Sequence, residues 1–313
     1  MPRSLSEAQL VEQSIQTTFR KALWNPFVAA VRRYDLISEG DRIAVCVSGG
    51  KDSMLLAKLM QLLRRVGKVP FDLVFLTMDP GYRPQNRCLL EENATRLAVP
   101  LKVFETDVFQ IANAADKHPC YLCARMRRGY LYSEAQALGC NKIALGHHFD
   151  DVIETTVMSM LYGGQLQGMM PKLHATNYPG MELIRPLYGV HEDAIIEWTH
   201  AHQLTFLQCA CRFTERSERS ERSDRLGQSD QTKDGQFSKR AEVKKLIQKL
   251  NSEDPDVGQR IFSSLHAVHI DTFPGWRTEG RDHSFLETYD LCSGLRTSAY
   301  EKPPDLDPGE DEE

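Results

Sequence analysis

The stretch Ile43-Ala-Val-Cys-Val-Ser-Gly-Gly-Lys-Asp-Ser-Met54 decides the fold of this 313-residue chain. Its first five residues are apolar without interruption, which is typical of a short strand buried in a sheet. The apolar positions of residues 51–63 predict a helix directly afterwards. Residues 48–53 therefore stand at the carboxyl end of a strand, which is where parallel α/β sheets bind their ligands.

The loop between this strand and this helix has the composition of a phosphate-binding turn. Gly49 and Gly50 allow the backbone to turn sharply and to come close to a ligand. The freed N–H groups and the helix N-terminus attract anions, and Lys51 adds a point charge for phosphate oxygens. Asp52 would repel phosphate unless a Mg²⁺ ion lay between them, so it is a candidate metal contact. The predicted nucleotide-binding residues of the loop are Ser48, Gly49, Gly50, Lys51, Asp52 and Ser53.

A second polar segment, Gly146-His-His-Phe-Asp-Asp151, follows another predicted strand. It again lies where a strand ends and a helix begins, so we expect it at the same edge of the sheet. Asp150 or Asp151 could instead cap the helix, and the two histidines could hold a metal ion. The further candidates for nucleotide binding or catalysis are Asp79, Gly146, His147 and Asp151.

Strand and helix signals alternate along the first half of the chain. This alternation predicts a parallel sheet covered by helices on both faces. Strands are expected at residues 43–47, 71–78, 101–105 and 142–146, and helices at 51–63, 87–97, 125–138 and 150–161. A helical segment at 6–36, broken at Asn25–Pro26, precedes the sheet, and helices at 189–202, 238–250 and 255–268 follow it.

Changes in composition divide the chain into five parts. These are an N-terminal helical segment at 1–37, the α/β domain at 38–213, a mobile polar loop at 214–237, C-terminal helices at 238–275 and a flexible tail at 276–313. The polar loop repeats the triplet Ser-Glu-Arg, a composition that cannot bury enough apolar surface to fold. The end of the tail, residues 303–313, holds six acidic residues and no basic one.

The charge of the chain is compatible with an RNA partner. The formal net charge is −5, but residues 303–313 contribute −6, so the remainder carries +1. Local basic clusters on a near-neutral body can bind RNA phosphates. The candidates are Lys21, Arg32, Arg33, Arg64, Arg65 and the arginines of residues 125–128. With no signal peptide and no apolar run of about 18 residues, we expect a cytoplasmic protein without a membrane span.

Two close cysteine pairs suggest a metal or redox site: Cys120-Tyr-Leu-Cys123 and Cys209-Ala-Cys211. The first pair precedes the helix predicted at residues 125–138 and fits half a zinc site, a redox dithiol or part of an iron–sulfur centre. The second pair has the wrong spacing for the usual zinc knuckle. Three thiolates on a [4Fe–4S] cluster would leave one iron open to sulfide, so a catalytic cluster is our first interpretation, with zinc or free thiols as alternatives.

Several segments together carry a family resemblance. Residues 120–129 read C-Y-L-C-A-R-M-R-R-G, residues 168–173 read G-M-M-P-K-L after Y-G-G at 162–164, and residues 184–187 read I-R-P-L. In order and spacing the chain resembles the tRNA 2-thiocytidine synthetase family. The S-G-G-K-D-S loop resembles the pyrophosphate loop of ATP pyrophosphatases and differs from the Walker pattern.

The resemblance implies an α/β fold with a parallel-sheet adenine-nucleotide alpha-hydrolase-like (PP-loop) domain and helical N- and C-terminal extensions. It also implies ATP-dependent tRNA thiolation. ATP adenylates the C2 oxygen of the cytidine at tRNA position 32, and sulfur held at a [4Fe–4S] cluster then replaces that oxygen, with release of AMP and pyrophosphate. The implied cofactors are ATP, Mg²⁺ and the cluster. Carried onto this sequence, the catalytic residues are Lys51, Asp52 and Asp151, and the cluster ligands are Cys120, Cys123 and Cys209.

The choice of the third cluster ligand depends on how this sequence aligns with the family's cysteine. The apolar run at residues 204–207 matches the strand that delivers the family's cysteine, which favours Cys209. Cys211 would share the same face of an extended chain, and Arg212 beside it would favour its thiolate, so Cys211 remains the alternative.

Two other functions stay open from the sequence. The same ATP chemistry could serve another nucleobase or a small amide-forming substrate, or the protein could bind nucleotide and cluster as a non-catalytic regulator. Intact Lys51, Asp52 and Asp151 disfavour the regulator. The expected partners are tRNA and a sulfur donor, either a cysteine desulfurase or sulfide, and a homodimer is left open.

Overall fold

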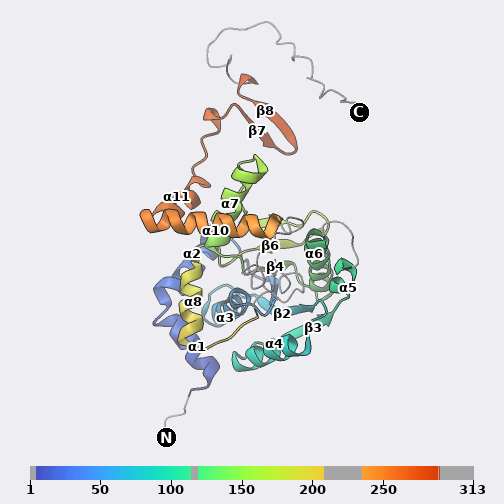
Figure 1. Ribbon diagram of the computed structural model, residues 1–313. Helices are drawn as coiled ribbons and strands as arrows, with labels where there is room; N and C mark the ends of the chain where they lie inside the picture. The colour runs from blue at the N-terminus through green and yellow to red at the C-terminus, as the bar shows by residue number, and fades with distance from the viewer. Residues whose placement is uncertain (1–4, 114–118, 208–234, 288, 290–313) are drawn as a thin grey trace, which may run out of the picture. The chain divides into compact units, whose positions relative to one another are not determined.

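The computed structural model of the protein describes residues 5–113, 119–207, 235–287 and 289 (Figure 1). The chain divides into two compact units, Met1–Phe262 and Ser263–Glu313. The first unit contains a mostly parallel sheet with helices on both faces, which confirms the predicted α/β fold. Among the described residues, no helix is both long and apolar enough to cross a membrane.

The sheet of the first unit has six strands in the order β3-β2-β1-β4-β6-β5. Their bounds are β1 Arg42–Cys46, β2 Asp72–Asp79, β3 Leu101–Glu105, β4 Lys142–Ala144, β5 Lys172–His174 and β6 Glu182–Ile184. All neighbouring pairs are parallel except β5 with β6, which is antiparallel. The two strands that precede the polar segments, β1 and β4, are adjacent at the centre of the sheet.

Helices cover both faces of this sheet. Their bounds are α1 Glu7–Gln16, the π-helix η1 Arg20–Trp24, α2 Asn25–Arg33, α3 Lys51–Val66, α4 Pro84–Arg96, α5 Val108–Asn113, α6 Pro119–Ala137, α7 Phe149–Gly163, α8 Glu192–Ala201, α10 Gly235–Glu253 and α11 Val257–Ser264. Helix α3 packs on β1 and β2 together with α1 and α8, whereas α6 packs on β2 and β4 from the other face. Helix α10 packs against α7.

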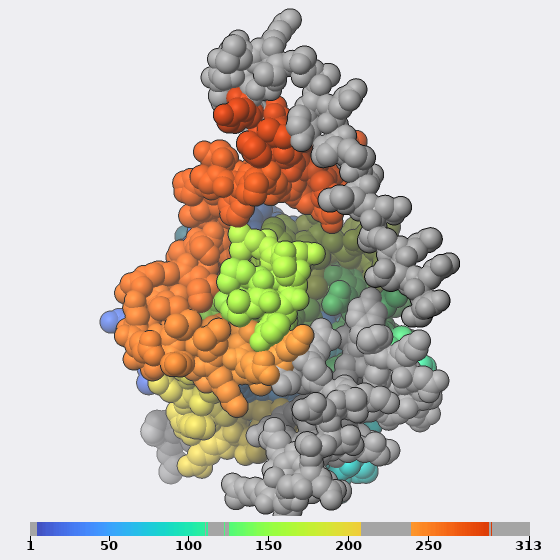
Figure 2. All heavy atoms as spheres, turned by 45° about the horizontal axis from the view of Figure 1, so that its top comes forward, coloured from blue at the N-terminus to red at the C-terminus, as the bar shows by residue number. Residues whose placement is uncertain are grey.

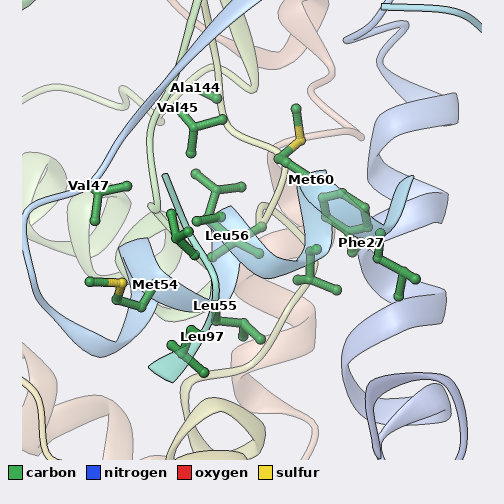
Figure 3. Packing of buried hydrophobic residues seen from close by; sticks show 14 of the residues in the cluster. Phe27, Val45, Val47, Met54, Leu55, Leu56, Met60, Leu97 and Ala144 are labelled. Carbon is green, nitrogen blue, oxygen red and sulfur yellow. The ribbon is translucent and has the colours of Figure 1, made fainter. Parts of the chain in front are cut away.

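Strand β1 shows how the sequence builds two cores. Successive strand residues point to opposite faces of a sheet. Ile43 and Val45 accordingly belong to the core beneath α3, and Ala44 and Cys46 belong to the core beneath α6. Figure 3 shows the first of these cores, where Val45 lies near Leu56 of α3 and Phe27 packs from α2.

The N-terminal helices differ from the prediction. The predicted break at Asn25–Pro26 is wrong, because η1 runs directly into α2 and Pro26 lies in the first turn of that helix. Because Trp24 and Asn25 are both helical, Pro26 lies inside a continuous helical run, where it removes one N–H donor to the preceding turn. The interruption falls earlier, where Thr17 ends α1.

Several short elements were not predicted. Helix α5 and strands β5 and β6 are absent from the expected pattern, and β5 makes the sheet mixed rather than wholly parallel. The run at 204–207 was expected to be a strand but is not one in the structure. Within the second unit, β7 Gly275–Thr278 and β8 Arg281–Ser284 form an antiparallel hairpin, so this part of the predicted tail is ordered. Residues 303–313 lie outside the described residues, as does most of the polar loop at 214–237.

Candidate active site

The phosphate loop is a turn that only glycine can make. Gly50 is the N-cap of α3, and Gly49 has φ +86°, a backbone conformation that favours glycine. A Cβ atom on Gly49 would lie 2.6 Å from Leu207 Cδ1 and 2.8 Å from Leu90 Cδ1. The backbone N–H of Leu207 also donates to the Gly49 carbonyl at 3.1 Å. The segment at 204–207 therefore packs beneath the loop instead of extending the sheet.

Two serines fix the shape of the loop. The Ser53 hydroxyl accepts a hydrogen bond from the Ser48 N–H at 3.1 Å and donates to the Gly50 carbonyl at 2.9 Å. The Ser48 hydroxyl donates to the Ser53 hydroxyl at 3.3 Å. Because these bonds hold the turn, the loop is preorganised for an anion at the N-terminus of α3.

The second polar segment lies directly against this loop. A Cβ atom on Gly146 would stand 3.1 Å from the Asp52 carbonyl carbon, 3.1 Å from the Ser53 nitrogen and 3.3 Å from the Asp52 oxygen. All three are backbone atoms of the first turn of α3. Glycine at position 146 thus lets the two strand ends meet.

Beside the two segments lies a cavity of about 400 Å³. It is lined by both motifs and by α6: Cys46, Val47, Ser48, Asp52, Ser53, Leu76, Met78, Arg127, Arg128, Leu131, Ile143, Leu145, Gly146, His147, Asp151 and Leu183. Apolar walls with a few polar groups are typical of small-molecule sites. The structure therefore brings together the predicted residues Ser48, Asp52, Ser53, Gly146, His147 and Asp151 at one cavity.

Lys51 is held by two carboxylates at the start of α3. Its Nζ lies 2.9 Å from Asp52 Oδ1 and 3.0 Å from Glu192 Oε1. Burial alone would lower the pKa of Lys51, but these two carboxylates outweigh burial and raise it. Glu192 begins α8 and was not predicted, because 141 positions separate it from its partner.

The pKa values of His147 and His148 are shifted in opposite directions. Burial lowers the pKa of His147 to about 4, so its imidazole is neutral at pH 7. The Arg185 Nε donates to His147 Nδ1 at 3.3 Å, which leaves the ring proton on Nε2. Burial would also lower the pKa of His148, but Asp150, Asp151 and Asp52 surround the ring at 3.5–3.8 Å and raise it.

Asp151 also pairs with a cation from a distant helix. Arg240 of α10 donates from Nη2 to Asp151 Oδ1 at 2.5 Å and from Nε to Glu154 Oε2 at 3.0 Å. Lys244, one turn further along α10, lies 2.5 Å from Glu192 Oε2. The sequence contained no signal for these contacts, since α10 follows the polar loop and shows no motif.

The Asp79 carboxylate is held by hydrogen bonds within and beside the turn that follows β2. Its Oδ1 accepts hydrogen bonds from the N–H groups of Gly81 and Tyr82 at 2.9 and 2.7 Å, and Arg87 donates to its Oδ2 at 2.6 Å. Burial alone would raise the pKa of Asp79, but these three donors lower it. Asp79 is not among the described residues that line the cavity. It stabilises the turn after β2.

The first cysteine pair lies within a helix. Cys120 and Cys123 belong to the first turns of α6, so the prediction that they precede the helix is wrong. Pro119 begins α6, and proline is favoured at that position. Their side chains, and Cys209 and Cys211 entirely, lie outside what the structure describes. Among the described side chains, no group of three His, Cys, Asp or Glu residues is placed to hold a metal ion.

Comparison with known proteins agrees with this geometry. The PP-loop domain family matches residues 12–222. The tRNA-cytidine(32) 2-sulfurtransferase of Citrifermentans bemidjiense is 35% identical over 244 residues, which cover 77% of this chain and 88% of that protein. The chain belongs to the tRNA-cytidine(32) 2-sulfurtransferase family of PP-loop proteins. The family resemblance predicted from the sequence is confirmed.

Other members of this 2-sulfurtransferase family are similar over different lengths. The protein of Anaeromyxobacter dehalogenans is 34% identical over 259 residues, 82% of each chain, and that of Aliivibrio fischeri is 40% identical over 188 residues, 58% of this chain and 59% of that one. The fold is similar to that of the U34-tRNA thiolase NcsA from Methanococcus maripaludis with its [4Fe-4S] cluster. That likeness has a TM-score of 0.57 over 77% of both chains, at 18% identity.

Proposed function

We propose that the protein is an ATP-dependent tRNA sulfurtransferase that thiolates the cytidine at position 32. It adenylates the C2 oxygen of that cytidine and replaces the oxygen with sulfur. The observation that carries the proposal is the meeting of two motifs at one cavity, where Gly146 lies within backbone contact distance of the phosphate loop. The family relatives named tRNA-cytidine(32) 2-sulfurtransferase support the choice of substrate.

The residues of the loop fit the phosphates of ATP. Backbone N–H groups at the N-terminus of α3 and the Lys51 ammonium would bind the β- and γ-phosphates. The cytidine C2 oxygen would attack the α-phosphorus, and the bond to the β-phosphate oxygen would break, so that pyrophosphate leaves. His147, neutral and with its proton on Nε2, is suited to donate a hydrogen bond to a developing negative charge.

The donor set also fits Mg²⁺. Asp52 and Asp151 line the same cavity, and one or two carboxylates together with substrate phosphates are the usual ligands of this ion. Bound Mg²⁺ would neutralise the phosphate charge that these carboxylates would otherwise repel. His148 Nε2 lies 3.8 Å from Asp52 Oδ1 and 3.5 Å from Asp151 Oδ2, so the two carboxylates lie close to one imidazole ring.

We assign Cys120, Cys123 and Cys209 as ligands of a [4Fe–4S] cluster. The first two are three residues apart in a helix, so they share one face of α6. Cys123 precedes Arg127, which lines the cavity, by four residues, and positions four apart in a helix are neighbours; this spacing supports the assignment. Such a cluster, when bound, supplies an iron with an open position that holds sulfur for transfer.

Sulfide or a cysteine desulfurase would supply the sulfur, and a homodimer remains a prediction. We expect the reaction in the cytoplasm, where tRNA is modified. A sedimentation measurement of the purified chain tests the dimer. Anaerobic assays with sulfide alone test whether a protein donor is needed.

Two experiments test the function. Mass spectrometry of tRNA nucleosides from a strain that lacks the protein should show loss of 2-thiocytidine, and an unchanged level would exclude the proposed substrate. Lys51→Ala should abolish tRNA-dependent AMP formation and keep the fold, because the Lys51 side chain is part-exposed at the first residue of α3. AMP formation at the wild-type rate would exclude the assignment of the loop.

A further inference from the structure

Helix α10 lies outside the PP-loop match, which ends at residue 222, yet it reaches the nucleotide site. It packs against α7 (Figures 1 and 2), and Val243 and Ile247 of this helix are buried. The space-filling view in Figure 2 shows α10, in orange, directly beside the lime surface of α7. The helix therefore covers the start of the element that carries Asp151.

The contacts between α10 and the site are ionic. Arg240 bridges Asp151 and Glu154, at 2.5 and 3.0 Å. Lys244 lies 2.5 Å from one oxygen of Glu192, whose other oxygen lies 3.0 Å from Lys51. Glu192 thus joins a lysine of α10 to the lysine of the phosphate loop.

These two cations reduce the negative charge of a carboxylate cluster beside the cavity, which Arg127 and Arg128 also line. The ion-pair network holds four carboxylates, Asp52, Asp151, Glu154 and Glu192, and α10 supplies two of its three cations, the third being Lys51. ATP is itself a polyanion, so uncompensated carboxylates beside its phosphates would oppose its binding. Glu154 and Glu192 are largely buried, with side-chain exposures of 8% and 16%, so solvent screens them weakly.

We propose that α10 is part of the ATP site, with Lys244 and Arg240 as positioning residues. Lys244 neutralises Glu192 and so lets that carboxylate hold Lys51 at the loop without adding net negative charge. Arg240 does the same for Asp151 and orients its oxygen at the cavity. The inference rests on the proposed binding of ATP and adds to it a segment beyond the PP-loop domain.

The test measures binding of α,β-methylene-ATP with Mg²⁺ to the full chain by calorimetry, without tRNA. Lys244→Met should weaken binding on the order of tenfold, the effect of one unit charge at roughly 10 Å in a partly buried site. Lys245→Met is the matched control, because Lys245 is the next residue of α10 and is exposed. The control should bind the analogue within about twofold of the wild type.

A rescue experiment separates electrostatic positioning from a structural role. With Glu192 neutral, Lys244 has no charge to compensate, so Glu192→Gln in the Lys244→Met chain should restore most of the lost affinity. Wild-type affinity in Lys244→Met, or no rescue in the double variant, would overturn the proposal. A wild-type chain that binds no analogue would overturn the ATP site and this inference with it. A chain that binds the analogue but does not thiolate tRNA would contradict the proposed function and leave the role of α10 standing.

Discussion

Replacing Gly146 by alanine adds one methyl group at the closest approach of the two nucleotide motifs. That methyl would stand 3.1 Å from two backbone atoms of the first turn of α3 and 3.3 Å from a third. The turn cannot move away easily, because the next residues of α3, Met54 and Leu55, are fully buried in the core (Figure 3). Overpacking of a well-packed site costs about 1–3 kcal/mol, and the lower chain entropy of alanine offsets about 0.4–1 kcal/mol. We expect a net loss of about 1–2 kcal/mol.

Thermal unfolding and nucleotide binding measure this change. A loss of that size lowers Tm by roughly 2–8 °C in a domain of this length. The displaced loop should also bind α,β-methylene-ATP about tenfold more weakly. Gly163→Ala is the control, because a Cβ there would meet only the Ser159 hydroxyl at 3.7 Å and the residue already lies in a helix. Wild-type Tm and affinity in Gly146→Ala would refute the close contact on which the site is built.

Three further changes test other parts of the protein. Asp41→Asn should cost about 1–3 kcal/mol, because it removes the nearer of the two carboxylates that buried Lys142 contacts, Asp41 at 2.7 Å, and leaves Glu182 at 3.2 Å. Burial would raise the pKa of Asp41, but Lys142, Ser38 and Asn141 outweigh burial and lower it; the stability difference from wild type should thus be complete above about pH 5 and shrink as pH falls below it. Denaturant titrations at pH 3 and 7 measure this, and an equal difference at both would contradict it. Cys209→Ser should abolish the cluster absorbance of anaerobically reconstituted protein, whereas Cys211→Ser should keep it; the reverse would name Cys211 as the ligand. Deleting residues 303–313 should leave Tm unchanged, and a large drop would mean that the acidic tail is docked.

The phosphate loop was predictable because all of its determinants are local. A buried strand, two glycines and a helix start lie within twelve residues, and the structure places α3 at Lys51, where the apolar spacing predicted a helix to begin. Strand β3 was predicted with its observed bounds for the same reason. Strands β5 and β6 have three residues each, as β4 does, but β4 lies in the apolar run Ile143-Ala-Leu145 and neither β5 nor β6 contains three consecutive apolar residues.

The ionic partners of the site could not be predicted, because they are distant in sequence from the residues that they contact. Glu192 lies 141 residues after Lys51, and Arg240 lies 89 residues after Asp151, and no motif surrounds either one. The run at 204–207 was expected as a strand because it is apolar. In the structure Leu207 is buried instead by contact with Gly49, which gives the same pattern of burial without a ladder of hydrogen bonds.

The place of β4 in the sheet has a consequence for synthesis on the ribosome. Strand β4 pairs with β1 although about a hundred residues separate them. The hydrogen bond from the Arg42 N–H to Asn141 Oδ1 spans the same separation. A nascent chain that ends at α5 already contains β1, β2, β3 and the phosphate loop, but Gly146 and Asp151 have not been made. Long-range strand pairing of this kind is slow relative to local folding. The cavity, which needs Gly146 and Asp151 as well as the phosphate loop, is therefore complete only after the second half of the sheet has docked on the first.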